Sequence, residues 1–374
     1  MKILKVAFCN RPEWDAPLGG DGVQMLKTKE SLERNYAISI DIITDPESLS
    51  NEYDIVHIFN FATHDITKKF IDKARTLGCK VVTSSIYWDY SYSSGHIFNY
   101  FIGLSVPKWK AKIIRRIVSF SSLIFGQPYL VSRKFKSIVE EFIQKSDLIL
   151  PNSIEEANLL CSFIKNDSYL CKMRVVHNAA NDDDTTYLEK ESFLKKYNLP
   201  DHYILQVGRI QWLKNQLNLL YALKDNPEIP IVFLGNNVEA GYSKKLRKLG
   251  KRRGNVYFIN AVPHDEVATF YKYARLHVLL SLRESPGLVS LEALVHHCPI
   301  VVATKEFAPV STYFSHQKYI VDPFDLDKIK DVITTAYKSP VFVAEDMSLF
   351  TWDYAAKQTM DAYCTLFNTE LKKN

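Results

Sequence analysis

Residues Leu276 to Thr304 read LHVLLSLRESPGLVSLEALVHHCPIVVAT, and this stretch decides the fold. Two short apolar runs, LHVLLS and PIVVAT, enclose a segment whose apolar residues recur with helical spacing. A buried strand, a helix and a second buried strand form the right-handed unit from which parallel sheets are built. The connection between the first strand and the helix carries Arg283, Glu284 and a Ser-Pro-Gly turn, and Glu292 follows on the helix. Packing alone does not explain why polar residues stand at this connection.

The same alternation of strands and helices runs along most of the chain. In the first half, strands are predicted at 5–10, 38–44, 54–61, 80–87 and 147–153, and helices at 23–35, 65–78 and 154–166. The pattern then restarts, with strands at 203–209, 230–235, 255–260, 276–281, 299–304 and 318–323, and helices at 213–226, 243–253, 264–274 and 325–337. This alternation predicts an α/β protein with two doubly wound parallel sheets.

The polar segment around Asn181 to Leu199 is expected to link two domains of similar size. We place the first domain at residues 1–185 and the second at residues 186–350. The amphipathic stretch within 351–374 is expected to form a helix that packs back on the first domain. Ligands of such sheets bind beyond the carboxyl ends of the strands, so two such domains are expected to face each other across a cleft.

Composition is that of a globular protein with large cores: among 374 residues, 47% are apolar and 24% are charged. The N-terminus lacks the features of a signal peptide, and no apolar run reaches the length of about 18 residues that a spanning helix needs. Six scattered cysteines without a CxxC pair predict free thiols in a reducing cytosol rather than a zinc site. A net charge of +5 is too small for the strongly basic domains that bind nucleic acid.

One basic segment stands apart from this balance. Between residues 90 and 139 there is no Asp or Glu, and lysines and arginines within 105–136 alternate with Trp109 and several isoleucines. A cationic amphipathic segment of this kind suits an anionic membrane surface. The alternatives are a solvated basic helix and a helix that meets an acidic substrate. The expected location is therefore cytoplasmic, with peripheral attachment to the inner face of the membrane if the first alternative holds.

The connection after LHVLLS has the chemistry of an anion site. Ser285 is a suitable N-cap and Pro286 a suitable first helical residue, so the helix is expected to run from there to about His297. Free amides at a helix start bind phosphate, and Gly287 leaves their approach open. Glu284 and Glu292 can each accept paired hydrogen bonds from vicinal hydroxyls. Together they favour a nucleotide sugar, whereas the alternative is an ordinary capped helix with two surface glutamates.

A second motif, VGRIQWLKN, follows the first strand of the same domain. It places Arg209 and Lys214 beyond the strand end, where two cations would neutralise a diphosphate without metal. The alternative is a pair of solvated side chains. The run Asp182-Asp183-Asp184 resembles a metal-binding acidic cluster, but it lies in the polar linker rather than at a strand end, so no catalytic metal is expected there.

The order of these motifs resembles the family 4 glycosyltransferases. Glu284 and Glu292 have the spacing of that family's paired glutamates, and VGR…KN is similar to its donor-diphosphate motif. PLGGDGVQM near the start, DLILPNS, VVHNAAN and PIVVAT before YIVDPFDLDKI follow in the same order over nearly the whole chain. The resemblance implies a GT-B architecture of two Rossmann-like domains and transfer of a sugar from a nucleotide-diphosphate-sugar. It also implies retention of the anomeric configuration and no metal or other cofactor.

Carried over residue by residue, the resemblance implies a site set. Arg209 and Lys214 would hold the donor diphosphate, Glu292 the ribose and Glu284 the transferred sugar. The implied donor-binding residues are Gly19, Gly20, Gly208, Arg209, Lys214, Glu284, Gly287, Leu288, Val289 and Glu292, and the implied catalytic residues are Arg209, Lys214, Glu284 and Asp89. The family often has a His after its fourth strand; Ile86 stands there, so Asp89, Tyr87 or His96 would share its role.

The expected partners are a nucleotide-sugar donor and a glycan or lipid-linked acceptor of cell-surface polysaccharide, such as capsule or O-antigen. Two alternatives remain: a small soluble acceptor, and a catalytically silent relative that binds glycan or a partner enzyme. The loop after PIVVAT reads KEFAPVS, with Phe307 where the family is usually glycine-rich, so the sugar is left open. The leaving phosphate itself can take the acceptor proton, which leaves positioning and charge stabilisation to the protein.

Overall fold

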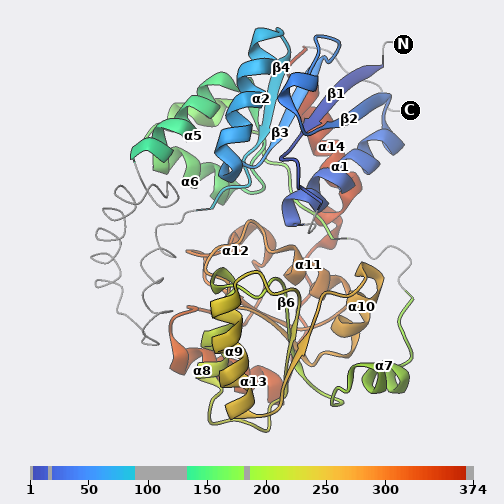
Figure 1. Cartoon of the computed structure of the whole chain (residues 1–374), viewed down its shortest axis with the longest axis vertical. Helices are drawn as coiled ribbons and strands as arrows, with labels where there is room; N and C mark the ends of the chain where they lie inside the picture. Colours follow the sequence, from blue (N-terminus) through green and yellow to red (C-terminus); the bar gives the residue numbers. More distant parts are fainter. Residues whose placement is uncertain (1–2, 16–18, 89–132, 181–185, 368–374) are drawn as a thin grey trace. The chain divides into compact units, whose positions relative to one another are not determined.

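The computed structural model describes residues 3–15, 19–88, 133–180 and 186–367. It contains two compact units, whose elements are labelled in Figure 1. The described part of unit 1 consists of residues 3–15, 19–88, 133–179 and 346–367, and that of unit 2 consists of residues 180 and 186–345. Unit 1 therefore takes up the chain again at residue 346, whereas the second domain was expected to extend to residue 350.

Unit 1 is built on a five-stranded parallel sheet with the order β2-β1-β3-β4-β5. The strands are β1 (Leu4–Cys9), β2 (Ile38–Ile43), β3 (Ile55–Phe59), β4 (Lys80–Ser84) and β5 (Leu148–Ile149). Val6 of β1 pairs with Ile40 on one side and with Ile55 on the other, which fixes the register at the centre of the sheet. The central strands β1 and β3 are mostly buried on both faces, as expected for a parallel sheet covered by helices on both sides, whereas the edge strand β2 exposes Ser39 and Asp41.

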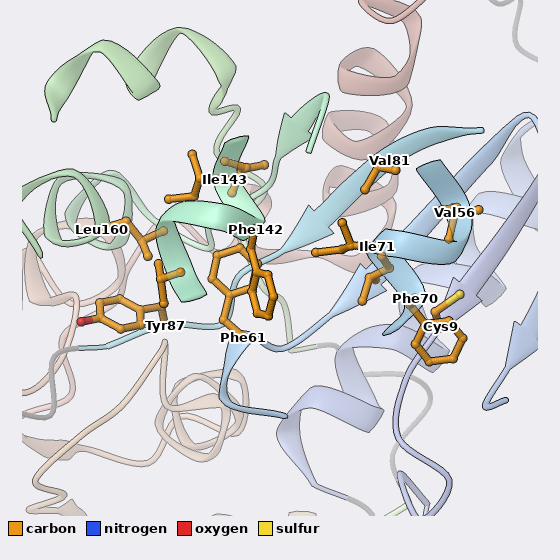
Figure 2. Close-up of a cluster of buried hydrophobic side chains, with 14 of the residues drawn as sticks. Cys9, Val56, Phe61, Phe70, Ile71, Val81, Tyr87, Phe142, Ile143 and Leu160 are labelled. Carbon is orange, nitrogen blue, oxygen red and sulfur yellow. The ribbon is translucent and has the colours of Figure 1, made fainter. Parts of the chain in front are cut away.

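Two groups of helices cover the two faces of this sheet. Alternate residues of β1 point to opposite sides, so Val6 and Phe8 meet one group and Ala7 and Cys9 the other. The first group is α1 (Gly20–Asn35) and α14 (Trp352–Cys364). The second group is α2 (His64–Thr76), α5 (Arg133–Lys145) and α6 (Ile154–Ile164). Figure 2 shows the core on this second side, with the rings of Phe61 and Phe142 edge to face at 5.4 Å.

Helix α14 packs back on unit 1, as the position of the amphipathic C-terminal stretch predicts. Its Asp353 accepts hydrogen bonds from Ser31, Arg34 and Asn35 of α1 at 2.5–2.8 Å. Its Tyr363 is buried and its hydroxyl lies 2.6 Å from Nδ1 of His57, whose Nε2 lies 2.9 Å from Ser84 Oγ. The last helix is therefore tied to β3 and β4 as well as to α1. Four short 3-10 helices complete the regular structure of the described part of unit 1, at Pro46–Ser48, Phe61–Thr63, Asp167–Lys172 and Met347–Phe350.

Unit 2 contains a six-stranded parallel sheet with the order β11-β10-β9-β6-β7-β8. Its strands are β6 (Ile204–Val207), β7 (Ile231–Leu234), β8 (Val256–Ile259), β9 (Leu276–Leu279), β10 (Ile300–Ala303) and β11 (Ile320–Val321). From β6 the chain adds strands outward through β7 and β8, then returns to the other side of β6 with β9, β10 and β11. This is the order of a Rossmann sheet, and its direction reverses between β6 and β9.

The α-helices in the described part of unit 2 are α7 (Lys190–Tyr197), α8 (Gln216–Ala222), α9 (Ala240–Arg253), α10 (His264–Tyr273), α11 (Leu288–Val295), α12 (Val310–Tyr313) and α13 (Leu326–Lys338). Leu219, Leu246 and Ile333 bring α8, α9 and α13 into one core with the strands. Helix α7 lies in the segment expected to be only a linker, and its buried Phe193 packs edge to face on Phe270 of α10 at 4.8 Å. Both sheets of the predicted α/β fold are thus confirmed.

Candidate functional site

The carboxyl ends of β6 and β9 carry the polar residues that the sequence singles out. These two strands are neighbours, with Leu205 paired to His277, and they flank the point where the strand order of unit 2 reverses. Open parallel sheets bind ligands at such a point because the connections on either side of it run in opposite directions and leave a crevice. The motifs around Lys214 and Glu284, distant in sequence, therefore meet at one edge of one sheet.

The connection after β6 is held by two buried glutamines. Gln206 donates from Nε2 to the backbone oxygen of Lys214 at 2.7 Å, and Gln216 donates from Nε2 to the backbone oxygen of Arg209 at 2.9 Å. Both glutamines are 1% exposed. The predicted helix over 213–226 is interrupted: a 3-10 helix covers Trp212–Lys214, Asn215 has φ of 55°, and α8 begins only at the next residue. Arg209 and Lys214 thus sit on a short rigid turn rather than on a long helix.

Gly235, at the end of β7, makes this turn possible, and the sequence reasoning missed it. A Cβ on Gly235 would lie 2.2 Å from the backbone oxygen of Gly208, and the φ of Gly235 is 148°. Gly208 itself donates to Leu234 and has φ of 137°, with Lys214 Cε 3.5 Å from where its own Cβ would be. The signal was present in the sequence as a glycine directly after an apolar run, which marks a close backbone approach.

Lys214 and Glu284 form an ion pair across the reversal point. Lys214 Nζ lies 2.5 Å from Glu284 Oε1, and the two side chains are only 20% and 11% exposed. The backbone around them is fixed as well, because Leu282 donates to the oxygen of Leu213 and Glu284 donates to the oxygen of Phe307, both at 2.8 Å. The connections after β6, β9 and β10 are therefore joined at this pair.

Helix α11 starts later than predicted, and the expected cap is wrong. The helix begins at Leu288 with Gly287 as its N-cap, whereas Ser285 and Pro286, joined by a cis peptide bond, precede it. Gly287 has φ of 92°, and a Cβ there would lie 3.2 Å from Leu279 Cδ2, so this turn favours glycine. The first amides of α11, those of Leu288 and Val289, therefore lie at the reversal point, where a helix start favours an anion.

Glu292 lies on α11 and accepts a hydrogen bond from the hydroxyl of Tyr271 on α10 at 3.1 Å. Burial, reinforced by the charge of Glu292, raises the pKa of Tyr271 well above its ordinary value. Arg209, by contrast, is partly exposed, and its guanidinium makes no hydrogen bond or ion pair within the described residues. Of the predicted residues in unit 2, the structure brings Lys214 and Glu284 into direct contact and leaves the guanidinium of Arg209 open to a ligand.

The predicted residues of unit 1 lie at the carboxyl edge of its own sheet. Gly19 is the N-cap of α1 and accepts from the amide of Val23 at 2.9 Å, and Gly20 is the first helical residue. Asp21, next along the helix, pairs with Arg11 and accepts from Asn60 Nδ2 at 3.3 Å. A carboxylate in the first turn suits the positive end of the helix dipole.

The segment after β4 contains a buried carboxylate that the sequence reasoning did not single out. Glu156 of α6 is fully buried and accepts from Ser85 Oγ at 2.5 Å, from the amide of Tyr87 at 2.7 Å and from the amide of Asn152 at 2.9 Å. Between two of these partners lies Ile86, the residue that the sequence resemblance placed at the family's His, with φ of 45°, an uncommon value for a β-branched residue. The positions of Asp89 and His96 lie outside the described residues.

Metal and membrane features can be reported only for the described part of the chain. There, no three His, Cys, Asp or Glu side chains gather as metal ligands would. Asp182-Asp183-Asp184 and residues 105–132 of the basic segment fall outside it. All six cysteines are free. No helix in the described part combines the length and the apolar character that crossing a bilayer requires.

The two parallel-sheet α/β units have the GT-B fold, and solved structures agree. The chain is similar to sucrose-phosphate synthase from Thermosynechococcus elongatus, with a TM-score of 0.70 and 16% identity over 98% of this chain and 100% of that one. It is also similar to Anabaena Alr3699/HepE solved with UDP-glucose, with a TM-score of 0.65 and 13% identity over 98% and 100%. At these identities the likeness shows the fold.

Sequence comparison gives a similarity to glycosyltransferases. Residues 189–350 match the family of glycosyl transferases group 1. The chain is 27% identical over 248 residues to a D-inositol 3-phosphate glycosyltransferase of Streptomyces avermitilis, covering 60% of this chain and 53% of that protein. It is 22% identical over 323 residues to the serotype-specific mannosyltransferase WbdA of Escherichia coli, covering 80% and 39%. The chain thus spans about half the length, or less, of these curated relatives.

Proposed function

We propose that the chain is a glycosyltransferase that moves a hexose-type sugar from a nucleotide-diphosphate-sugar to a glycan or lipid-linked acceptor of cell-surface polysaccharide. One observation carries the proposal: Lys214 and Glu284 meet at the strand-order reversal of a group 1 domain. A cation there suits a diphosphate, and a carboxylate beside it suits sugar hydroxyls.

The donor side is supported by both chemistry and likeness. Arg209, Lys214 and the first amides of α11 offer positive charge and N–H donors at one sheet edge. The similar structure of Anabaena Alr3699/HepE was solved with UDP-glucose. A nucleoside diphosphate held by Arg209 and Lys214 would bring its ribose toward Glu292 and its sugar toward Glu284.

For the reaction, we propose that the acceptor hydroxyl oxygen attacks the anomeric carbon from the face that the diphosphate leaves. The bond from that carbon to the diphosphate oxygen breaks, and the leaving phosphate takes the acceptor proton. The products are the glycosylated acceptor with retained configuration and a nucleoside diphosphate. Arg209 and Lys214 stabilise the negative charge that develops on the leaving group, which is the largest contribution that a protein without a nucleophile can make.

We also propose that no divalent metal takes part. The two side-chain cations next to β6 supply the positive charge that Mg²⁺ or Mn²⁺ supplies in other phosphate chemistry. Transfer is therefore expected to proceed at an unchanged rate in excess EDTA. A rate that falls with EDTA and returns with added Mg²⁺ or Mn²⁺ contradicts this part of the proposal.

The acceptor is proposed from the relatives. WbdA is a serotype-specific mannosyltransferase, which favours a surface polysaccharide, whereas the inositol phosphate enzymes favour a small acceptor as the second candidate. The basic segment at 105–136 would place the enzyme at the inner membrane face. Flotation with vesicles of neutral or anionic phospholipid tests this, because only the anionic vesicles are expected to carry the protein. The third candidate function is that of a catalytically inactive protein that binds glycan or a partner enzyme.

The deciding experiment is a donor screen. Thermal unfolding with UDP-, GDP-, ADP-, CDP- and dTDP-sugars identifies the donor, because a ligand of the folded state raises the midpoint. Release of the matching nucleoside diphosphate then measures turnover, and NMR of the product gives the anomeric configuration. Lys214→Ala is expected to weaken donor binding and to lower kcat/KM for transfer about 100- to 1,000-fold. A chain that binds none of these donors contradicts the enzyme assignment, and binding without turnover on any acceptor favours the silent relative.

A further inference from the structure

Tyr271 has no role in the site as inferred from sequence, yet it contacts one of its residues directly. Its hydroxyl donates to Glu292 Oε2 at 3.1 Å, from α10 to α11. Glu292 is the residue proposed to accept the ribose hydroxyls. A carboxylate has lone pairs for about four hydrogen bonds, so a donor on one oxygen can set the orientation of the whole group and still allow a ligand to bind.

The ring of Tyr271 is fixed from two sides. It stacks on His296 at 5.8 Å with an interplanar angle of 19°, and it meets His277 edge to face at 5.5 Å. His296 is in turn held by the hydroxyl of Tyr187, which lies 3.0 Å from its Nδ1. Tyr271 is 1% exposed. Its hydroxyl is therefore presented at one point, next to Glu292.

The direction of this hydrogen bond is also fixed. Burial first, and then the negative charge of Glu292, raise the pKa of the Tyr271 hydroxyl well above its ordinary value, so that it keeps its proton. Tyr271 is therefore the donor and Glu292 the acceptor of this hydrogen bond. Helices α10 and α11 thus share a polar contact in which the tyrosine supplies the proton.

We propose that Tyr271 is a positioning residue for donor binding, which orients the Glu292 carboxylate toward the ribose hydroxyls of a nucleoside diphosphate without touching the donor itself. The inference rests on the proposed function and adds a residue and a ligand requirement to it. The required ligand feature is a nucleotide with intact 2′ and 3′ hydroxyls. A merely structural hydrogen bond between two helices has no such requirement.

The test compares Tyr271→Phe with the wild type, since this change removes only the hydroxyl and keeps the ring. Dissociation constants of UDP, GDP and ADP, and of their 2′-deoxy and 3′-deoxy forms, are measured by calorimetry. Tyr271→Phe is expected to weaken the best-bound ribonucleotide about 3- to 10-fold, the usual range for one hydrogen bond. For the deoxy form that lacks the contacted hydroxyl, the change is expected to stay below about 2-fold. Glu292→Gln is likewise expected to weaken the binding of the ribonucleotide more than the binding of the deoxy form.

Tyr203→Phe is the matched control. Tyr203 is another fully buried tyrosine of unit 2, and its hydroxyl donates to the backbone oxygen of Phe270 at 2.9 Å. Its loss is expected to lower the unfolding midpoint about as much as Tyr271→Phe does. It is expected to leave the ratio of ribonucleotide to deoxynucleotide affinity at the wild-type value.

Two results overturn the inference and leave the proposed function standing. One is a Tyr271→Phe variant whose affinities for ribonucleotides and deoxynucleotides fall by the same factor. The hydroxyl would then only stabilise the contact between α10 and α11. The other is a variant that binds like the wild type while the wild type still prefers ribonucleotides. A wild-type chain that binds none of the nucleotide sugars of the donor screen instead overturns the proposed function itself.

Discussion

The ammonium of Lys214 lies 2.5 Å from the carboxylate of Glu284, and this pair joins the end of β6 to the end of β9. Both groups are mostly buried, so each is held in place by the other in an environment that screens charge weakly. In the proposed function, the diphosphate would bind Lys214 and the sugar would bind Glu284, and the position of each group is already fixed before the ligand binds. This preorganisation lowers the cost of binding.

Lys214→Ala tests the charge at this point. The change removes the cation and leaves Glu284 buried without its partner, so kcat/KM for transfer is expected to fall about 100- to 1,000-fold. Lys224→Ala is the control, because Lys224 is an exposed lysine of the same unit, 66% exposed and 4.0 Å from Asp225. The control should keep full activity. Transfer by Lys214→Ala within threefold of the wild type contradicts the assigned role.

Gly235→Ala tests the close approach of β7 to the turn after β6. The added Cβ would lie 2.2 Å from the backbone oxygen of Gly208, so the turn that carries Arg209 must move. Donor affinity is expected to fall more than about tenfold, and the unfolding midpoint by several degrees, at about 2–4 °C per kcal/mol. Gly254→Ala provides a matched change, since Gly254 has φ of 80° but open space around it. If both variants behave alike, backbone strain rather than crowding explains the effect.

The burial of His57 and His277 predicts that the free energy of unfolding falls on mild acidification. Burial lowers the pKa of each to about 3, whereas the unfolded chain has its ordinary value near 6.5. Between these values the unfolded state binds more protons, so the free energy of unfolding rises with pH and is lost as pH falls below about 6.5. From pH 6.5 to 5 each histidine contributes about 2 kcal/mol to this loss.

The measurement is the unfolding midpoint between pH 5 and 7.5 for the wild type and for His57→Gln. The variant keeps hydrogen-bonding capacity toward Tyr363 and Ser84 but cannot take up a proton, so its midpoint should depend less on pH. His202→Gln, at an exposed position, should retain the wild-type dependence. An identical pH dependence in His57→Gln and the wild type rules out His57 as a source of the effect.

Glu156→Ala tests the buried carboxylate of unit 1. Its removal leaves Ser85 Oγ and the amides of Tyr87 and Asn152 without this acceptor, and each unsatisfied buried donor costs about 1–3 kcal/mol. The free energy of unfolding should therefore fall by at least about 3 kcal/mol. Glu155→Ala removes a neighbouring, partly exposed carboxylate and should change it by less than about 1 kcal/mol. Equal losses in the two variants contradict the special role of Glu156.

The strands and their alternation with helices could be predicted from the sequence. Buried parallel strands are short apolar runs, which are recognisable from neighbouring residues alone. The proximity of Lys214 and Glu284 also followed, once both were placed at strand ends of one parallel sheet. Their direct ion pair did not, since it depends on side-chain geometry across 70 residues of sequence.

The errors share one physical origin, which is competition between local preference and contacts that are distant in sequence. Ser285 and Pro286 have the local chemistry of a helix start, but Gly287 with its positive φ takes the cap and Glu284 is held by Phe307. Asn215, in the left-handed region, interrupts a stretch with good helical spacing. Glu156 looked like one more polar residue of an amphipathic helix, and only its partners at Ser85 and Tyr87 show what it does.

The division of the chain also bears on how it folds during synthesis. The described part of unit 2 falls within residues 180–345, whereas unit 1 takes its last helix, α14, from the final stretch of the described chain. Trp352, Met360 and Tyr363 are buried in the core that also contains Val6 and Ile40. During synthesis, α1 alone can therefore cover this face of the first sheet until the second sheet and α14 have been made, and the part of the face left for α14 would offer a chaperone an apolar binding surface.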